Sequence, residues 1–581
     1  MMKKIPYGLS DFPRIIREDY YYVDKSHFIE LIEDQPPYLF LIRPRRFGKS
    51  LFLALVETYY DVRYAGSFEE IFGHLYIGKH PTPSHNQYLV LRFNFSEISS
   101  NVEEVERSFK EYCTLRLLQF VSDYEDLLGA EIWKRLEGIK EDPSMLLSAI
   151  NMYASSKGNI SIYLLIDEYD NFTNTILSNY GTERYRKATH GEGFIRGFFN
   201  TIKAATTGPG SALKRLFITG VSPVTMDDVT SGFNIGTNIS MDAMFNSIIG
   251  FKETELRKML TYYKEAGALS NTVDELVETM KPWYDNYCFS EDCLDESMYN
   301  SDMTLYFLNN YLLQKKAPKA MVDNNIRTDY NKLRHLIRLD KTFGANASII
   351  QEIISKGSIA AHISTAFPAE DITKPDNFKS LLYYFGLLSI REIKEGDIVL
   401  QVPNLTVREQ LYTYLAEAYR TADLFDLDTT ELSALVKKMA YRGEWEPVFC
   451  FFAAELERQS TIREFIEGEA HVKGFLLAYL GLTRGYIILP EHESSKGYAD
   501  FYMMPDLLHQ PDIAYSYIVE VKYATRSDSE EKIATLKAEA IDQLHHYAAD
   551  PKVRDSKGKT ELRLIVLVFK GWELVVMEKI E

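Results

Sequence analysis

The sequence predicts an α/β protein whose first part is a parallel sheet flanked by helices. Apolar segments with strand character alternate with helical segments from residue 1 to about 250, as a parallel sheet requires. The first of these segments runs directly into Gly48-Lys49-Ser50, and helical periodicity starts at Leu51. The expected strands are 38–42, 88–95, 161–166 and 215–220.

The loop after strand 38–42 has the chemistry of a phosphate site. Backbone N–H groups at a helix start form an anion site, which Lys49 would complete by reaching the terminal phosphates. The Ser50 hydroxyl would join the shell of a Mg²⁺ ion. The G-x-x-x-x-G-K-[ST] pattern has Arg43 in place of its first glycine, so the loop alone also allows an ordinary helix start capped by Ser50.

A second strand supplies the carboxylates of the same site. Strand 161–166 is followed by Asp167 and Glu168, which is the arrangement that puts one carboxylate on Mg²⁺ and the other beside the attacking water. This pair follows the loop in the expected order and favours a nucleotide site. At the end of strand 215–220, Thr219 and Ser222 are polar groups suited to sensing a γ-phosphate, and a plain turn is an equal alternative.

From about residue 251 the pattern becomes mainly helical, which predicts a helical lid. A helix at 376–385, a β-hairpin over 387–402 and a further helix from Val407 predict a winged-helix-like unit. Such a unit can bind DNA, but because the chain is acidic, packing between an ATPase and its effector is the favoured expectation. The expected domains are 1–250, 251–440 and 441–581.

Composition bounds the choice of partners. The 581 residues include 83 acidic and 65 basic side chains, a net charge of −18, and 46% are hydrophobic. The charge argues against indiscriminate coating of nucleic acid or of an anionic membrane, so any nucleic-acid contact needs a local basic patch. The four cysteines do not have zinc-site spacing, and neither a signal peptide nor a membrane-spanning stretch is recognised, which predicts a cytoplasmic protein without membrane association.

A second constellation lies after residue 440. Asp500 lies in a predicted strand, and Glu520 and Lys522 follow in the next one, two residues apart and therefore on the same face. Such carboxylates hold one or two Mg²⁺ ions in metal-dependent phosphodiesterases, where the lysine orients water or steadies the developing charge. Glu469 at a helix start is expected to support the metal, and Gln543 on a following helix to orient the lysine or the phosphate.

An isolated Glu-x-Lys on a strand is usually an exposed cross-strand ion pair. The preceding aspartate strand, the glutamate-bearing helix and the glutamine-bearing helix together favour a nuclease-type site. The expected catalytic residues of the chain are therefore Glu168, Glu469, Asp500, Glu520, Lys522 and Gln543. The expected metal ligands are Ser50, Asp167, Asp500 and Glu520.

With both sites in view, the sequence resembles proteins that join an AAA-ATPase-like region to a C-terminal PD-(D/E)XK nuclease-superfamily domain. The segments that carry the resemblance are 5–12, 22–26, Arg43-Pro-Arg-Arg-Phe-Gly-Lys-Ser50, 165–168, 219–222, 283–287, 403–404 and Glu520-Val-Lys522. Asn286 stands where the family pattern usually shows glycine, and asparagine tolerates the left-handed backbone that glycine provides.

The resemblance implies an N-terminal P-loop sheet and a C-terminal restriction-endonuclease-like α/β domain. It implies ATP as cofactor, with Mg²⁺, or Mn²⁺ in the nuclease site. The expected nucleotide-binding residues are Arg46, Phe47, Gly48, Lys49, Ser50, Asp167 and Thr219. The expected function is an ATP-dependent switch or motor that governs a DNA nuclease, in a chain that is able to form homo-oligomers.

Two alternatives from other classes stay open. The first is a nucleotide-gated binding protein whose nuclease-like domain holds nucleic acid or a protein partner without cleavage. The second is an ATPase whose last domain serves only as a scaffold for oligomers.

Overall fold

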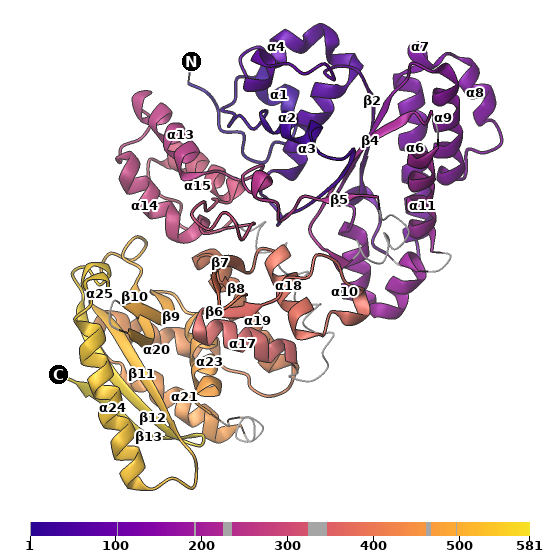
Figure 1. Cartoon of the computed structure of the whole chain (residues 1–581). Helices are drawn as coiled ribbons and strands as arrows, with labels where there is room; N and C mark the ends of the chain where they lie inside the picture. Colours follow the sequence, from indigo (N-terminus) through magenta and orange to yellow (C-terminus); the bar gives the residue numbers. More distant parts are fainter. Residues whose placement is uncertain are drawn as a thin grey trace. The chain divides into compact units, whose positions relative to one another are not determined.

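The computed structural model describes residues 2–101, 103–190, 193–208, 210–224, 235–323, 345–459, 466, 468–494 and 497–581. The chain divides into two compact units, Met1–Leu336 with Ala361–Ile398, and Ile337–Ala360 with Val399–Glu581. The region predicted as a separate middle domain, 251–440, therefore contributes residues to both units (Figure 1).

The first unit is built on a five-stranded sheet of order β2-β3-β4-β1-β5 in which every pairing is parallel. Its strands are β1 (Tyr38–Ile42), β2 (Leu89–Asn94), β3 (Ile162–Asp167), β4 (Leu213–Gly220) and β5 (Thr237–Asn238). All six residues of β3 are buried, as expected for a strand covered on both faces. The predicted parallel sheet is confirmed, with strand ends within about two residues of the expected ones.

Helices flank this sheet and extend beyond its β2 edge, where α6, α8 and α9 gather (Figure 1). The helices of the first unit are α1 (Phe12–Arg17), α2 (Phe28–Glu33), α3 (Lys49–Tyr60), α4 (Phe68–Phe72), α5 (Tyr76–Lys79), α6 (Val105–Asp123), α7 (Glu125–Leu128), α8 (Glu131–Leu136), α9 (Pro143–Lys157), α10 (Asn171–Thr189), α11 (Phe194–Thr207), α13 (Glu253–Glu265), α14 (Val273–Tyr284), α15 (Ser301–Gln314) and α18 (Pro375–Tyr384). The helical stretch predicted after residue 251 is thus represented by α13, α14 and α15.

The second unit contains a mixed five-stranded sheet of order β13-β12-β11-β10-β9. Its strands are β9 (Tyr486–Ser494), β10 (Gly497–Pro505), β11 (Tyr515–Ala524), β12 (Glu561–Lys570) and β13 (Glu573–Ile580). Only β11 and β12 pair in parallel. The connection between them carries α24 (Glu530–Ala548) and α25 (Pro551–Ser556), because parallel neighbours need a long crossover.

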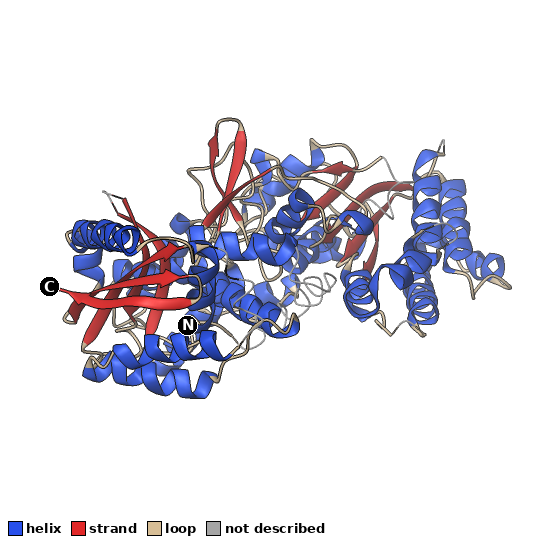
Figure 2. Ribbon diagram, turned by 90° about the horizontal axis from the view of Figure 1, so that it is seen from below, coloured by secondary structure: helices blue, strands red, loops and turns tan. Residues whose placement is uncertain are grey.

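The apolar stripe of α24 covers one face of this sheet. Ile533, Ala540 and Leu544 pack in one cluster with Ile518 of β11 and Val566 of β12. Further helices pack on the strands as well, and Figure 2 shows helices on both sides of them. The remaining helices of the unit are α17 (Ala345–Lys356), α19 (Leu405–Thr421), α20 (Thr429–Arg442), α21 (Glu446–Arg458) and α23 (Glu469–Leu480).

The expected helix–hairpin–helix order is present between α18 and α19. The strands β7 (Ser389–Lys394) and β8 (Asp397–Gln401) are joined by Glu395 and Gly396, which have φ values of 55° and 94°. Two left-handed residues in a two-residue loop are typical of a tight hairpin turn. A third strand, β6 (Ser358–Ala361), joins this sheet in the order β6-β8-β7.

A search of the described residues finds no helix with the length and apolar character needed to cross a membrane.

Gly386 lies in the connection between α18 and β7, close to Pro44 in the loop after β1. A substitution at Gly386 therefore tests whether this connection positions the loop. Gly386 and Gly396 have φ values of +76° and +94°, so alanine is strained at both positions. A Cβ on Gly386 would lie 2.8 Å from Cβ of Pro44, whereas a Cβ on Gly396 would meet nothing within 4 Å. We therefore expect Gly386→Ala to displace the loop and weaken binding of a fluorescent ATP analogue about tenfold, a loss of ~1.4 kcal/mol.

Gly396→Ala is the matched control and should lower stability by about 1 kcal/mol without changing ATP affinity. Equal affinity in the two variants would show that Gly386 does not position the loop.

Candidate functional site

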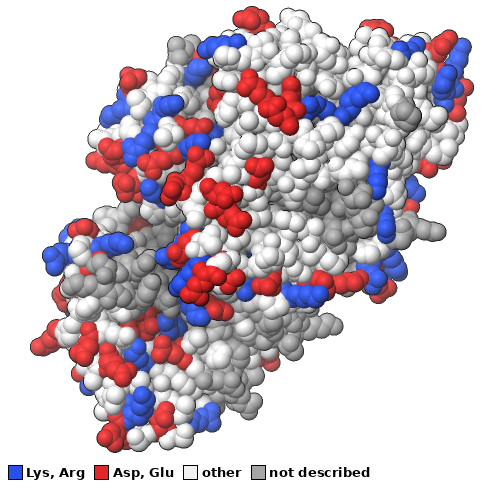
Figure 3. Space-filling view, in the orientation of Figure 1, with Lys and Arg blue, Asp and Glu red and all other residues white. Residues whose placement is uncertain are grey.

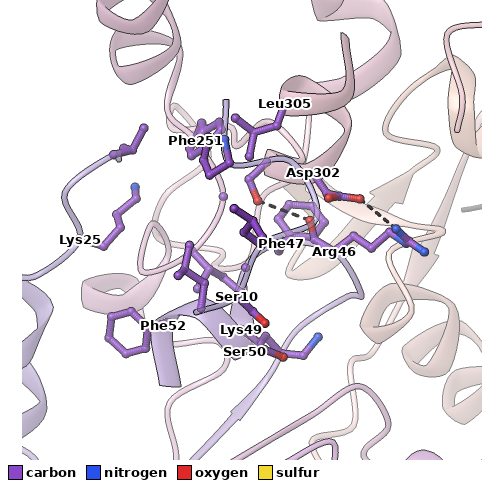
Figure 4. A pocket seen from close by; sticks show the side chains of 18 of the residues that line it. Ser10, Lys25, Arg46, Phe47, Lys49, Ser50, Phe52, Phe251, Asp302 and Leu305 are labelled. Carbon is purple, nitrogen blue, oxygen red and sulfur yellow. Dashed lines mark hydrogen bonds and ion pairs between the residues drawn. The ribbon is translucent and has the colours of Figure 1, made fainter. Parts of the chain in front are cut away.

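A cavity of about 490 Å³ lies at the N-terminal end of α3. Its wall combines the chain's N-terminal segment, the loop after β1, the segment 248–251 and the start of α15 (Figure 4). Its lining includes Arg45, Arg46, Phe47, Gly48, Lys49, Ser50, Glu168 and Asp302. The helix start expected to bind phosphate therefore faces a cavity.

Lys49 is turned back onto its own loop. Its Nζ donates hydrogen bonds to the carbonyl oxygens of Arg43 (2.9 Å) and Pro44 (2.8 Å). Burial lowers the pKa of the Lys49 ammonium, and the charges of Glu168 and Asp167 oppose that effect. Within the loop Gly48 has φ 98°, a backbone conformation that favours glycine.

Arg43, the departure from the phosphate-loop pattern, has a structural role. Its guanidinium is buried and donates to the carbonyl oxygens of Ser240 and Phe245, the latter at 3.1 Å. The same group lies 4.3 Å from the ring centroid of Phe289, a cation–π contact. Burial lowers the pKa of Arg43 to about 10. The arginine thus attaches the loop to the segment after β5. The residue spacing within the loop does not predict this contact.

Two residues of the loop that were expected to bind the nucleotide have protein partners. Arg46 has φ 65°, and its side chain reaches Asp302 at the start of α15, with 3.0 Å between Nη1 and Oδ2 (Figure 4). Phe47 is buried and packs edge-to-face on Tyr287 and Phe289, at centroid distances of 4.8 and 5.4 Å. The loop is therefore attached to the segments that follow the sheet. Both residues still line the cavity.

Strand β4 lies between β1 and β3, which brings Thr219 next to Asp167. The Thr219 hydroxyl donates to Oδ1 of Asp167 at 2.7 Å. Oδ2 of Asp167 is buried without a hydrogen bond and lies 3.6 Å from Nη2 of Arg92. A buried carboxylate oxygen without a hydrogen bond suits a cation, which is compatible with the Mg²⁺ role expected of Asp167. Ser50 lines the neighbouring cavity, and its Mg²⁺ role stays a prediction. Arg92, which the sequence analysis did not single out, also pairs with Glu57 at 2.8 Å.

Glu168 follows β3 in a left-handed conformation, with φ 51°. Such a conformation in a non-glycine residue is uncommon and re-aims the side chain at the strand end. Burial raises the pKa of the Glu168 carboxyl, and the charges of Lys49 and Arg45 oppose the shift. The carboxyl lines the cavity that holds Lys49, which fits the expected catalytic role.

Asp170 organises the end of β4 and was missed by the sequence analysis. Its buried carboxylate accepts the N–H groups of Val221 and Ser222, at 3.1 and 2.5 Å from Oδ2. The Ser222 hydroxyl oxygen accepts the N–H of Val224 at 3.2 Å. Ser222 is therefore engaged in a local turn, which was the alternative to a phosphate contact.

In the second unit β10 and β11 bring the expected carboxylates together. Oε2 of Glu520 accepts the backbone N–H of Asp500 at 3.2 Å, and Oδ2 of Asp500 accepts the N–H of Val521 at 2.6 Å. Lys522 donates to Oε1 of Glu520 at 2.8 Å. Asp500 and Glu520 are 7% and 1% exposed. The three residues that the sequence analysis grouped thus form one cluster, in which the carboxylates are buried and the Lys522 side chain is 12% exposed.

Electrostatics within this cluster favours a bound cation. Burial and the negative charge of Asp500 raise the pKa of Glu520 to about 7, and the Lys522 charge opposes the shift. Burial disfavours the Lys522 ammonium, yet the charges of Glu520 and Asp500 outweigh that cost and raise its pKa. A carboxylate pair with such a raised pKa is the donor set that a divalent cation would stabilise.

Glu469 and Gln543 lie on the two helices expected to support the cluster. The charge of Glu469, at the start of α23, is among the causes that raise the pKa of Lys522. Oε1 of Gln543, on α24, is buried without a hydrogen bond, and α24 packs on β10 and β11. A buried acceptor without a hydrogen bond is able to bind a donor group of a ligand or a cation. In the described residues no group of three or more His, Cys, Asp or Glu side chains is arranged to hold a metal.

Lys473 is a residue of this cluster that sequence reasoning missed. It lies one helical turn after Glu469, and its Nζ is 2.6 Å from Oδ1 of Asp500. The spacing of four residues on a helix was the available signal, because it places both side chains on the same face of α23.

Restoring the first glycine of the phosphate-loop pattern tests the role of Arg43. We expect Arg43→Gly to destabilise the first unit by about 2–4 kcal/mol, because it empties a filled site and removes the guanidinium that donates to the carbonyl oxygens of Ser240 and Phe245. ATP binding should weaken with it. Calorimetric unfolding and titration with an ATP analogue measure both effects; unchanged stability with tighter ATP binding would contradict the structural role.

The raised pKa of Glu520 predicts a pH-dependent stability difference. A carboxyl with a raised pKa binds more protons in the folded state, so its contribution to stability is lost as pH rises from about 4.5 to about 7. Glu520→Gln lacks this titration, and its unfolding temperature relative to the parent should rise over that pH range and level off above it. The measurement is scanning calorimetry in EDTA; a difference independent of pH would contradict the prediction.

Comparison with known proteins agrees with this architecture. Residues 6–230 match the family described as "Predicted AAA-ATPase", and residues 467–579 match the "PD-(D/E)XK nuclease superfamily". A curated relative is the "Uncharacterized protein in vnfD 5'region" of Azotobacter chroococcum mcd 1, 26% identical over 447 residues, which are 73% of this chain and 74% of the relative. The chain therefore joins an AAA-ATPase-like domain to a C-terminal domain of the PD-(D/E)XK nuclease superfamily.

Proposed function

We propose that this protein is an ATP-dependent switch or motor coupled to a Mg²⁺-dependent nuclease that acts on DNA. The observation that carries the proposal is the buried cluster of Asp500, Glu520 and Lys522, linked by hydrogen bonds from side chains and backbone. Burying two carboxylates side by side is costly, so an arrangement of this kind is typical of a site kept for chemistry.

In the ATPase half, ATP would occupy the cavity at the start of α3. Lys49 would exchange the carbonyl oxygens of Arg43 and Pro44 for phosphate oxygens, and the N–H groups of the helix start would bind the same anion. Glu168 would orient the attacking water. Ser50 and Asp167 would hold Mg²⁺, which neutralises charge on the phosphates when bound.

In the nuclease half, Asp500 and Glu520 would hold Mg²⁺ or Mn²⁺, which polarises the scissile phosphate and lowers the pKa of a water molecule. Lys522 would keep its position on Glu520 and steady negative charge on the phosphate. Glu469 would support the cation from the start of α23. Gln543 would orient the lysine or the phosphate through its amide group.

A nucleotide-gated binding protein is the second candidate. Both buried carboxylates already have an ammonium partner, Lys473 on Asp500 and Lys522 on Glu520, which is a stable arrangement without a metal. On the face shown in Figure 3 acidic and basic side chains are interspersed, in keeping with the net charge of −18. Binding of a nucleic acid or protein without cleavage is compatible with both observations.

Cleavage of labelled linear and circular DNA with Mg²⁺ or Mn²⁺, with and without ATP, decides between the candidates. We expect cleavage by the parent protein and a loss of at least 10²-fold in Lys522→Ala, because the charge beside the scissile phosphate is removed. Lys579→Ala, which changes an exposed lysine of β13, is the matched control and should cleave normally.

Lys49→Ala tests the coupling. If ATP governs the nuclease, this variant should lose the response of cleavage to ATP while it retains the ATP-independent rate. Intact DNA under all conditions, together with ATP-dependent association, would favour the binding protein.

A further inference from the structure

Lys473 gives the C-terminal site a second buried ammonium. The side chains of Lys473 and Asp500 are 8% and 9% exposed, and 2.6 Å separates Nζ from Oδ1. Lys522 and Glu520 form the other pair, with 2.8 Å between Nζ and Oε1. The two carboxylates and two ammonium groups therefore sum to zero charge.

All four carboxylate oxygens accept a hydrogen bond. On Asp500, Oδ1 accepts from Lys473 and Oδ2 from the N–H of Val521. On Glu520, Oε1 accepts from Lys522 and Oε2 from the N–H of Asp500. The Lys473 ammonium thus lies on the Oδ1 side of Asp500, where α23 approaches the strands.

The charge of this group of side chains disfavours binding of two divalent cations. Two such ions carry four positive charges, whereas the two buried carboxylates supply two negative ones and Glu469 at most a third. Adding the second ion beside the buried Lys473 ammonium would place like charges within a few ångströms in a site of low dielectric, which is strongly unfavourable. One divalent cation is compatible with Lys473 remaining in place.

We propose that Lys473 is a resident cation that occupies the position of a second metal ion, so that the site takes one divalent cation. Lys473 is in this sense a positioning residue, because it fixes Asp500 through Oδ1. The inference rests on the proposed nuclease site, but its test counts bound cations and does not depend on cleavage.

The test is titration of the full-length, EDTA-stripped protein with Mn²⁺ in the absence of nucleotide, followed by calorimetry and by electron paramagnetic resonance of free Mn²⁺. Equivalents that persist in Asp500→Asn belong to other sites and are subtracted. The parent protein should bind one equivalent at the C-terminal site. Lys473→Met should bind a second equivalent, or bind the first at least tenfold more tightly, because the competing charge is gone.

Two further variants separate charge from packing. Lys473→Arg retains a cation and should bind one equivalent, as the parent does. Lys522→Met removes the other lysine, and we expect it to lose cleavage without gaining a second cation. Unfolding temperatures provide a further measurement: Lys473→Met should be less stable than the parent in EDTA, and saturating Mn²⁺ should restore most of the difference.

Several results would overturn the inference. If the parent protein binds two equivalents of Mn²⁺ and Asp500→Asn loses both, the inference is wrong, while the nuclease proposal stays intact. This result does not require any Lys473 variant to fold. The inference is also wrong if Lys473→Met binds Mn²⁺ with the same stoichiometry and affinity as the parent. It is wrong as well if neither the parent nor the variant binds Mn²⁺. One equivalent in the parent and two in Lys473→Met, without DNA cleavage, would support the inference and reject the nuclease proposal.

Discussion

Buried charge on the strands of the two sheets, or directly after them, is the constraint on which both units depend. Asp167 ends β3, Asp170 follows three residues later, and Asp500 and Glu520 lie in β10 and β11, all at least nine-tenths buried. A buried carboxylate is tolerated when a donor or an opposite charge compensates it. Several of these partners come from other elements, and each of those fixes the position of the element that carries it.

In the first unit this compensation ties the sheet to its surroundings. Thr219 donates to Asp167 across the β3–β4 pair, and the N–H groups after β4 donate to Asp170. Arg43 contributes a buried positive charge, which is held by the carbonyl dipoles of Ser240 and Phe245. The loop after β1 is therefore positioned by contacts on both of its sides, and the Lys49 ammonium donates to two carbonyl groups of the same loop.

In the second unit compensation comes from two lysines of different origin. Lys522 lies on the same strand as Glu520, while Lys473 comes from a helix that precedes the sheet. The strand lysine is part of the pattern that the sequence resemblance carries, and the helix lysine is an addition to it. With this addition, each of the two buried carboxylates has a lysine partner.

The sequence by itself determined the elements whose signals are local. Apolar runs with β-branched residues predicted the bounds of β1 to β4, β10 and β11 to within a few residues. Such runs are a local signal, because burial of one or both faces of a strand imposes a short-range sequence pattern. The Gly48-Lys49-Ser50 loop, the Asp167-Glu168 pair and the Glu520-x-Lys522 pair were located for the same reason. Asn286 has the left-handed backbone, φ 71°, that its place in a glycine position predicted.

Only the tertiary structure decided the partners that lie far apart in the chain. Arg43 bonds a carbonyl group 197 residues away, and Lys473 meets an aspartate 27 residues away on another element. Arg46, expected near phosphate, pairs with an aspartate 256 residues later. A charged side chain has several candidate partners in any sequence, and the order and pairing of the strands select among them. For that reason sequence reasoning pointed to individual charged residues, whereas folding determined which charges neutralise them.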